Sequence, residues 1–95
     1  MGATIAPPPG PQTADTLGWI LASSGKTDTA LPLLRQASTE ATNDPRIIYH
    51  YGVALKNAGK KDDAIKQLTT VAEWKAEFKE KEDAKALLTE LGKGS

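Results

Sequence analysis

The sequence predicts an all-α fold, and three observations lead to this prediction. Apolar residues recur at steps of three and four along most of the chain, as in Ile48, Tyr51 and Leu55. A set of residues reappears 34 positions later. The alternation of apolar and polar residues that marks β-strands does not occur. The 95 residues, of which 39% are hydrophobic, suffice for one small domain with a single core.

The first twelve residues differ in composition from the rest of the chain. They include four prolines and two glycines and carry no charged side chain. A segment of this kind has little apolar surface to bury and favours polyproline-like conformations. We therefore expect residues 1–12 to form a disordered leader.

The expected helices have recognisable ends. Gly25 and Gly59 fall where the first helix of a pair must stop, since glycine adopts the left-handed cap conformation without steric cost. Asp28 and Asp62 follow three residues later and are placed to cap the next helix. Together with the apolar periodicity, these signals predict helices near residues 13–24, 28–41, 45–58, 62–75 and 79–91.

Two prolines refine these boundaries. Pro32 lies four residues after Asp28, which predicts that it occupies the first turn of its helix, where a missing amide costs little. Pro45 ends the string Asn43-Asp44-Pro45, which is typical of a stop followed by a new helix start. The second helical hairpin is therefore expected to begin at residue 45.

An internal repeat is the strongest signal in the sequence. The series Leu17-Gly18, Gly25, Asp28-Thr29-Ala30, Leu34 and Ala37 reappears as Tyr51-Gly52, Gly59, Asp62-Asp63-Ala64, Leu68 and Val71. A period of 34 residues is typical of one family of helix-turn-helix repeats. From Gln12 to about Trp74 the chain resembles the tetratricopeptide repeat, although Thr42 stands where the family usually has proline.

The repeat has a physical basis in close helix packing. We expect Gly18 and Gly52 to face Ala30 and Ala64, so that the backbones approach and leucines interdigitate. Two such units need a further covering element, because neighbouring units bury the faces that one hairpin leaves open. The last segment supplies it with an apolar stripe of Phe78, Ala84, Leu87, Leu88 and Leu91. We expect its polar face to be solvated at Lys79, Glu80, Lys81, Glu82, Asp83 and Lys85.

The predicted organisation is therefore a fragment of a right-handed α-solenoid. It consists of two antiparallel helix-turn-helix units, residues 13–44 and 45–76, and of a capping helix with its tail, residues 77–95.

A narrower resemblance concerns the C-terminal part of long bacterial repeat proteins. It is carried by Asp15-Thr16-Leu17-Gly18-Trp19, Ala30-Leu31-Pro32-Leu33-Leu34, Ile48-Tyr49-His50-Tyr51 and Glu82-Asp83-Ala84-Lys85-Ala86-Leu87-Leu88. These strings resemble the repeat lipoproteins associated with PEP-CTERM protein sorting and exopolysaccharide export. The resemblance implies a periplasmic or envelope-associated scaffold; without it, a cytoplasmic location would be expected.

Composition argues against several function classes. Twelve basic residues balance twelve acidic ones, so nucleic acid is an unexpected partner. There is no cysteine, and no apolar run approaches the roughly 20 residues needed to span a bilayer. His50 is the single histidine, so neither a catalytic triad nor a histidine-based metal cluster is expected. Gly25-Lys26-Thr27 lacks the earlier glycine of a phosphate loop. We predict no enzyme activity, cofactor, metal site or membrane insertion.

Binding of a protein or peptide is the predicted function. In the family that the chain resembles, the first helices line a concave groove; the matching positions are Gln12, Asp15, Thr16, Trp19, Ala22, Ser23, Arg46, Tyr49, His50, Val53, Lys56 and Asn57. From these we predict a partner-binding groove of Asp15, Trp19, Arg46, Tyr49, His50, Val53 and Asn57. Trp19 and Tyr49 are the most informative members, because amphipathic aromatic residues dominate interface energies.

Two alternatives stay open. Trp19 could instead pack against the leader or the next helix. The chain could also be a structural or self-associating solenoid segment without a peptide ligand. A clamp for a chaperone's terminal carboxylate is disfavoured, because the family's clamp has lysine and asparagine where this chain has Asp15 and Trp19.

Overall fold

The computed structural model describes residues 10–93, and most of the predicted leader, residues 1–9, lies outside the described residues. The described chain forms five α-helices near the predicted positions: α1 Pro11–Ser23, α2 Thr27–Glu40, α3 Pro45–Asn57, α4 Lys61–Ala72 and α5 Lys79–Lys93. Pro11 and Gln12, which the sequence prediction assigned to the leader, form the start of α1. Proline fits the first helical position, because the amide that it lacks would have no partner there.

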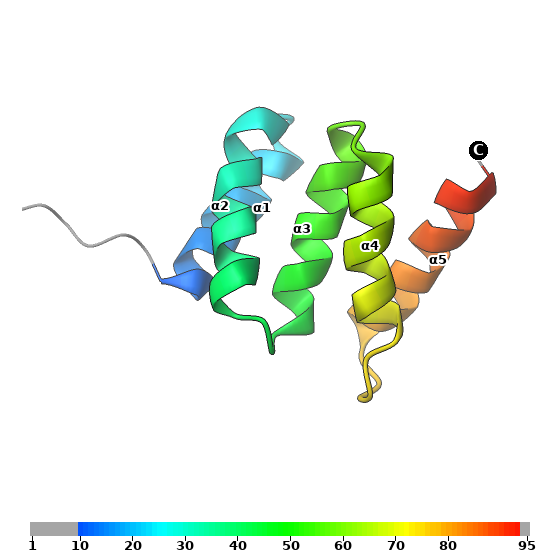
Figure 1. The fold of residues 1–95 in the computed structure, drawn as a ribbon. Helices are drawn as coiled ribbons and strands as arrows, with labels where there is room; N and C mark the ends of the chain where they lie inside the picture. Colours follow the sequence, from blue (N-terminus) through cyan, green and yellow to red (C-terminus); the bar gives the residue numbers. More distant parts are fainter. Residues whose placement is uncertain (1–9, 94–95) are drawn as a thin grey trace, which may run out of the picture.

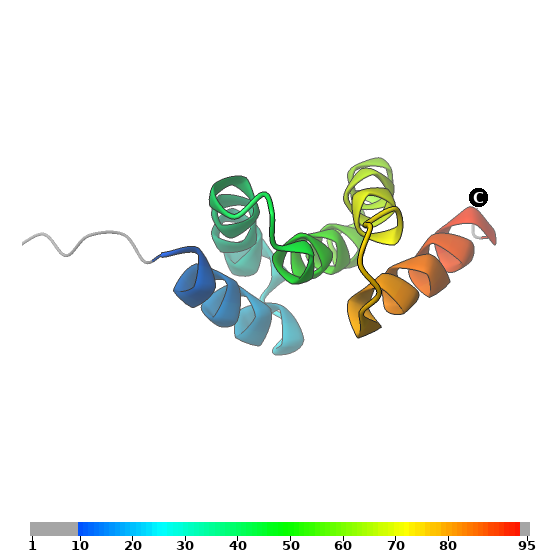
Figure 2. The same cartoon turned by 90° about the horizontal axis from the view of Figure 1, so that it is seen from below.

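The helices are arranged as two antiparallel hairpins followed by a single covering helix (Figure 1). α1 pairs with α2, α3 pairs with α4, and α5 packs against α4. Seen end-on, α1, α3 and α5 lie on one side of the molecule, whereas α2 and α4 lie on the other (Figure 2). No strand occurs between residues 10 and 93. The all-α prediction of two helical hairpins and a capping helix is confirmed.

Glycine makes both hairpin turns, as predicted. Gly25 has φ 83° and Gly59 has φ 80°, values that residues with a Cβ rarely adopt. The prediction that Asp28 and Asp62 cap the following helices is wrong. The N-cap positions are lysines without a side-chain cap bond, and the two aspartates lie in the first turn. There their negative charges complement the positive end of the helix dipole. They do not act as N-caps.

The two prolines behave differently from one another. The start of α3 follows the prediction, because the Asp44 side chain accepts a hydrogen bond of 3.1 Å from the Arg46 amide and Pro45 is the first helical residue. Pro32 does not lie in the first turn, since α2 begins at Thr27 and the proline falls inside the helix. Pro32 and Asp28 are both exposed, so water can bond the Asp28 carbonyl that Pro32 leaves without an amide donor.

Each hairpin is held together by a glycine facing a leucine. A Cβ added to Gly18 would lie 2.7 Å from Leu34 Cγ, and one added to Gly52 would lie 2.9 Å from Leu68 Cδ2. Both leucines are fully buried. The sequence prediction placed Ala30 and Ala64 opposite the glycines; the leucines one helical turn later are the nearest side chains. The close approach was predicted correctly, but its partner residues were not.

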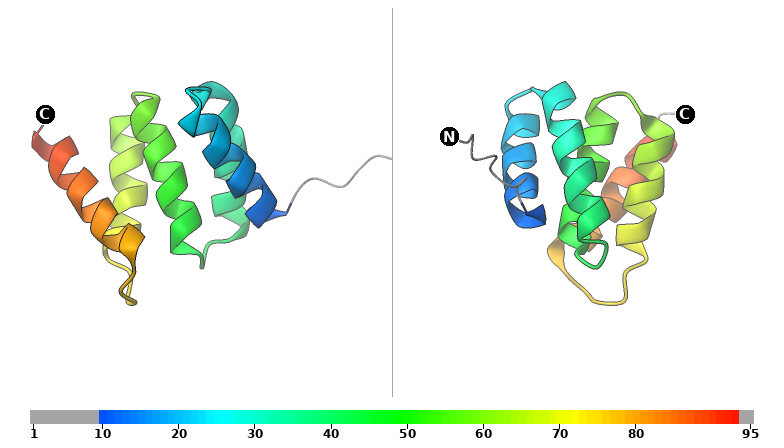
Figure 3. Two further views of the ribbon diagram at one scale, coloured as in Figure 1. Left: turned by 180° about the vertical axis from the view of Figure 1, so that it is seen from behind. Right: turned by 60° about the vertical axis from the view of Figure 1, so that its left-hand side comes forward.

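Helix α5 covers the end of the core. It slants across the second hairpin (Figure 3) and buries Ala84 against Leu68 and Val71, with Phe78, Leu87, Leu88 and Leu91 packed around them. Lys81, expected in solvent, is buried instead. Its Nζ donates 2.6 Å to the Trp74 carbonyl and 2.7 Å to Glu77 Oε2, which fastens the connection between α4 and α5.

Candidate partner-binding groove

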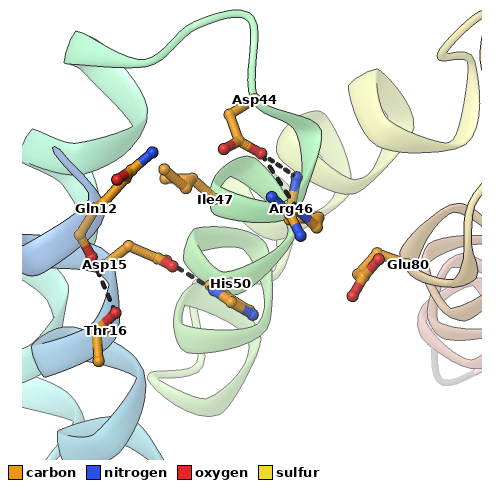
Figure 4. A pocket seen from close by; sticks show the side chains of 8 residues that line it. All are labelled: Gln12, Asp15, Thr16, Asp44, Arg46, Ile47, His50 and Glu80. Carbon is orange, nitrogen blue, oxygen red and sulfur yellow. Dashed lines mark hydrogen bonds and ion pairs between the residues drawn. The ribbon is translucent and has the colours of Figure 1, made fainter.

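The first helices of the units and the capping helix form a recessed surface, which we call the groove. α1 and α5 both pack against α3 without touching one another, and all three helices lie in front when the molecule is seen from behind (Figure 3, left). Between them lies a cavity of about 310 Å³ (Figure 4). It is lined by Gln12, Asp15, Thr16, Asp44, Arg46, Ile47, His50 and Glu80.

An aromatic cluster adjoins this cavity. The Trp19 indole stacks on the His50 imidazole with ring centroids 4.1 Å apart and planes 21° apart. Tyr49 lies 6.5 Å from Trp19 at a tilt of 48°, which is a favourable aromatic arrangement. All three side chains are half-buried. They therefore form a wall that is supported by the protein and still presents ring surface.

Asp15 fixes the imidazole of this cluster. His50 Nδ1 lies 2.7 Å from Asp15 Oδ1, and the two side chains are only 19% and 15% exposed. An ionised carboxylate can only accept, so Nδ1 carries the hydrogen and donates it. Asp15 and Trp19 are four residues apart on α1, which places both side chains toward α3. Two residues of α1 therefore set the orientation of the His50 ring: Asp15 through the hydrogen bond and Trp19 through stacking.

Charged residues surround the mouth of the cavity. Arg46 Nε lies 3.7 Å from Asp44 Oδ1, and the Arg46 side chain is 67% exposed. Glu80 reaches toward the cavity from α5, on the far side from Asp15 (Figure 4). The Glu80 carboxylate makes no ion pair with another residue of the described range.

The hydroxyl of Tyr49 has a pKa above its ordinary value. Burial raises the pKa of Tyr49, and the nearby Asp83 carboxylate raises it further, whereas Lys79 opposes the increase. Near neutral pH a tyrosine hydroxyl is protonated even without this shift, so the phenol can donate a hydrogen bond to a ligand. It also presents an apolar ring beside the Trp19 indole.

The described residues offer few other kinds of site. Between residues 10 and 93, no three side chains of histidine, cysteine, aspartate or glutamate converge in a way that could hold a metal ion. Within the same range, the helices are too short or too polar to cross a membrane. What the groove supplies is ring surface, hydrogen-bond donors and acceptors, and a few charges.

Comparison with known proteins agrees with this architecture. Residues 21–91 match the family described as Tetratricopeptide repeat. The chain belongs to the tetratricopeptide repeat family. Repeats of this family serve generally as protein-protein interaction modules and are typically non-catalytic scaffolds. The comparisons with curated proteins and with solved structures gave no match. The family match does not bear on the narrower resemblance to export-associated lipoproteins.

The tetratricopeptide register brings most of the predicted site residues together. Asp15, Arg46 and His50 line the cavity, and Trp19 and Tyr49 lie beside it, in ring contact with His50. Val53, which is half-buried, and Asn57, which is exposed, lie further along α3 outside the cavity lining. Among the wider set of register positions, Ala22 is wrong as a groove residue. It is buried in the core with Ala30, Leu34 and Ala54, so its side chain is covered by the packing of α1 on α2 and α3 and is not open to a partner.

Sequence reasoning missed two features of the site. The Asp15–His50 contact joins residues 35 positions apart, and no motif marks it. Glu80 was assigned to a solvated helix face. The repeat itself could have found it, because Glu80 lies one period of 34 residues after Arg46. Applying the register to the capping helix would have placed Glu80 in the groove.

Proposed function

We propose that this chain is a protein-interaction module whose groove holds an extended or helical segment of a partner protein. The observation that carries the proposal is the supported aromatic wall, in which Trp19 stacks on His50 and His50 is bonded to Asp15. Partner atoms would pack on the exposed ring surface of Trp19 and Tyr49. The Tyr49 hydroxyl and the charged groups of the cavity mouth would fix the orientation of the segment.

The expected binding energy favours the aromatic wall over the rest of the surface as the place where a partner binds. Tryptophan and tyrosine are the residues most often found as interface anchors, and truncating an anchor typically costs about 2 kcal/mol or more. Here the rings are already held by α1 and α3, so binding need not immobilise free side chains. The wall also adjoins a cavity of about 310 Å³, which is large enough to receive a partner side chain.

A test of the groove begins with peptides selected from a displayed library of random nine-residue sequences, with the intact chain as bait. We expect Trp19→Ala and Tyr49→Ala to weaken the selected peptides at least about tenfold, while far-ultraviolet circular dichroism shows unchanged helix content.

Glu82→Ala is the matched control, because Glu82 is an exposed residue of α5 that does not line the cavity. Lys79 is less suitable, since it lies close enough to Tyr49 to affect the pKa of the phenol. Selected peptides that bind both aromatic variants as tightly as the wild type would refute the groove.

A second candidate function, self-association, is favoured by one observation. Leu17 and Ile20 on α1 are 46% and 56% exposed, and no other large hydrophobic residue of the described range is as open. Their equivalents one repeat later, Tyr51 and Ala54, pack against the first hairpin. The outer face of α1 is therefore an uncovered stacking face.

Concentration-dependent light scattering tests this second function. Self-association through α1 predicts a mass that rises with concentration and falls back to the monomer in a Leu17→Lys, Ile20→Lys variant. A strict monomer at millimolar concentration would exclude it.

A further inference from the structure

The cavity of the groove has an unbalanced set of charges. Its lining contains three carboxylates, those of Asp15, Asp44 and Glu80, but only one guanidinium, that of Arg46. Arg46 lies beside Asp44, so these two charges largely offset each other. Asp15 and Glu80 remain, one on each side of the cavity. This part of the groove therefore favours a positive group, although the whole chain has no net charge.

The two remaining carboxylates have different roles. Asp15 uses Oδ1 to accept from the His50 ring, which holds the carboxylate in place at the cavity wall. Glu80 makes no ion pair with another described residue and is half-buried. A carboxylate that is partly removed from water without a cationic partner gains from any cation that a ligand brings.

The aromatic wall favours the same kind of ligand on independent grounds. Trp19 and Tyr49 offer ring surface with a negative face, which attracts ammonium and guanidinium groups. The aliphatic stem of lysine or arginine also packs well on aromatic rings. Ring surface and carboxylates therefore favour the same side chain: a long apolar stem that ends in a positive charge.

We propose that the groove selects partner segments that carry an arginine or lysine side chain, whose charged end lies between Asp15 and Glu80 and whose stem lies along the Trp19–His50 stack. This inference rests on the proposed function of the groove and names the chemistry of its partner. An acidic segment is the opposing possibility, because the exposed Arg46 could attract it. The acidic segment would have to approach two carboxylates to reach that one cation.

The library selection described above tests this inference through the composition of the selected peptides. We expect arginine and lysine to be enriched at one position, next to a position that favours aromatic or large aliphatic residues. A chosen peptide is then compared with versions in which the basic residue is replaced by glutamine or by glutamate. The affinity for the chain should fall roughly fivefold in the glutamine version and further in the glutamate version.

Substitutions on the protein locate the basic side chain. Glu80→Gln should weaken the chosen peptide roughly fivefold and should reduce the difference between its arginine and glutamine versions. Asp15→Asn should act in the same direction, and circular dichroism of each variant checks that the helices remain. Glu82→Gln is the control, because Glu82 lies on the same helix, is exposed, and pairs with Lys85 at 3.4 Å.

The outcomes separate this inference from the function on which it rests. Peptides that lose binding to Trp19→Ala but show no basic preference, or an acidic one, would overturn the charge inference and leave the groove intact. The same holds if Glu80→Gln has no more effect than Glu82→Gln. Peptides that ignore Trp19 and Tyr49, or a library that yields no binder, would count against both.

Discussion

The two repeat units of this chain carry equivalent residues in the core but different residues at the positions that line the groove. Gly18 and Gly52 stand at equivalent positions, each faces an equivalent leucine, and each unit turns at an equivalent glycine with positive φ. These positions keep the same residue because two helices can approach closely only where a small side chain meets a large one. What repeats is therefore the packing of the hairpin.

Groove positions change from one helix to the next. Following the 34-residue period, Gln12 corresponds to Arg46 and Glu80, whereas Trp19 corresponds to Val53 and Leu87. Apart from Leu87, which packs on the core of the second hairpin, none of these residues lies in a core cluster, so each helix can carry different chemistry at the same place. Within one 34-residue repeat, the positions that stabilise the hairpin are therefore different from the positions that are available to bind a partner.

The largest expected effect concerns the shared core. Leu34→Ala and Leu68→Ala should each lower the free energy of unfolding by about 2–5 kcal/mol, because both side chains are fully buried and their removal leaves a cavity. Urea denaturation of the two variants measures this. A loss below about 1 kcal/mol in one of them alone would mean that the two units are not packed alike.

An exchange between equivalent positions sharpens the comparison. Ala54 is fully buried beside Leu34, whereas its equivalent Ile20 is 56% exposed. Ala54→Ile should therefore overpack the interface between the hairpins and cost about 1–3 kcal/mol. Ile20→Ala should change stability by only about 0.5 kcal/mol or less. Equal effects in thermal denaturation would show that the outer face of α1 is covered.

A smaller effect on stability is expected from the Asp15–His50 hydrogen bond, which lies in the groove and also contributes to the fold. The Asp15–His50 hydrogen bond is largely shielded from water and joins α1 to α3. A double-mutant cycle with Asp15→Ala and His50→Ala should give a coupling of about 1 kcal/mol in chemical denaturation. Additive single effects would mean that the contact does not support the aromatic wall.

The smallest effect is a dependence on pH. Lys81 donates to Glu77 and thereby lowers the pKa of the Glu77 carboxyl below its usual value of 4.5. A carboxyl with a lowered pKa adds stability above the unfolded pKa and loses it as the pH falls through the folded pKa. Glu77→Gln should therefore be slightly less stable than the wild type at pH 7, and this difference should vanish in acid.

Urea midpoints between pH 7 and pH 3 follow this difference. Glu40→Gln, at the exposed end of α2, is the control. A difference between the wild type and Glu77→Gln that is the same at every pH would rule out the linkage.

Much of the fold could be predicted from the sequence, because helix periodicity and turn glycines are local signals. The helix order, Gly25, Gly59 and the Asp44-Pro45 start were all found in this way. The errors concern three-dimensional context. Lys81 seemed solvated because its neighbours are charged, and only the path of the α4–α5 connection brings the Trp74 carbonyl to its ammonium group.

The candidate site could be predicted in outline only. The register placed Trp19, Tyr49 and His50 on neighbouring helices, since equivalent positions of successive first helices share a face. The stacking of Trp19 on His50 could not be predicted, because it depends on how α1 and α3 cross. The contribution of α5 depends on where the capping helix lies, and a solvated charge pattern does not reveal that.

The most direct test of the division between core and groove is nuclear magnetic resonance mapping of a selected peptide on the isotope-labelled chain. We expect shift changes on α1, α3 and the start of α5, including the indole N–H of Trp19, identified by its absence in Trp19→Phe. A different cavity, of about 200 Å³, lies between α2, α3 and α4 and is lined by Leu31, Pro32, Arg35, Tyr51, Leu55, Lys60 and Asp63. Shift changes confined to that cavity, with the Trp19 indole signal unmoved, would contradict the assignment of the groove.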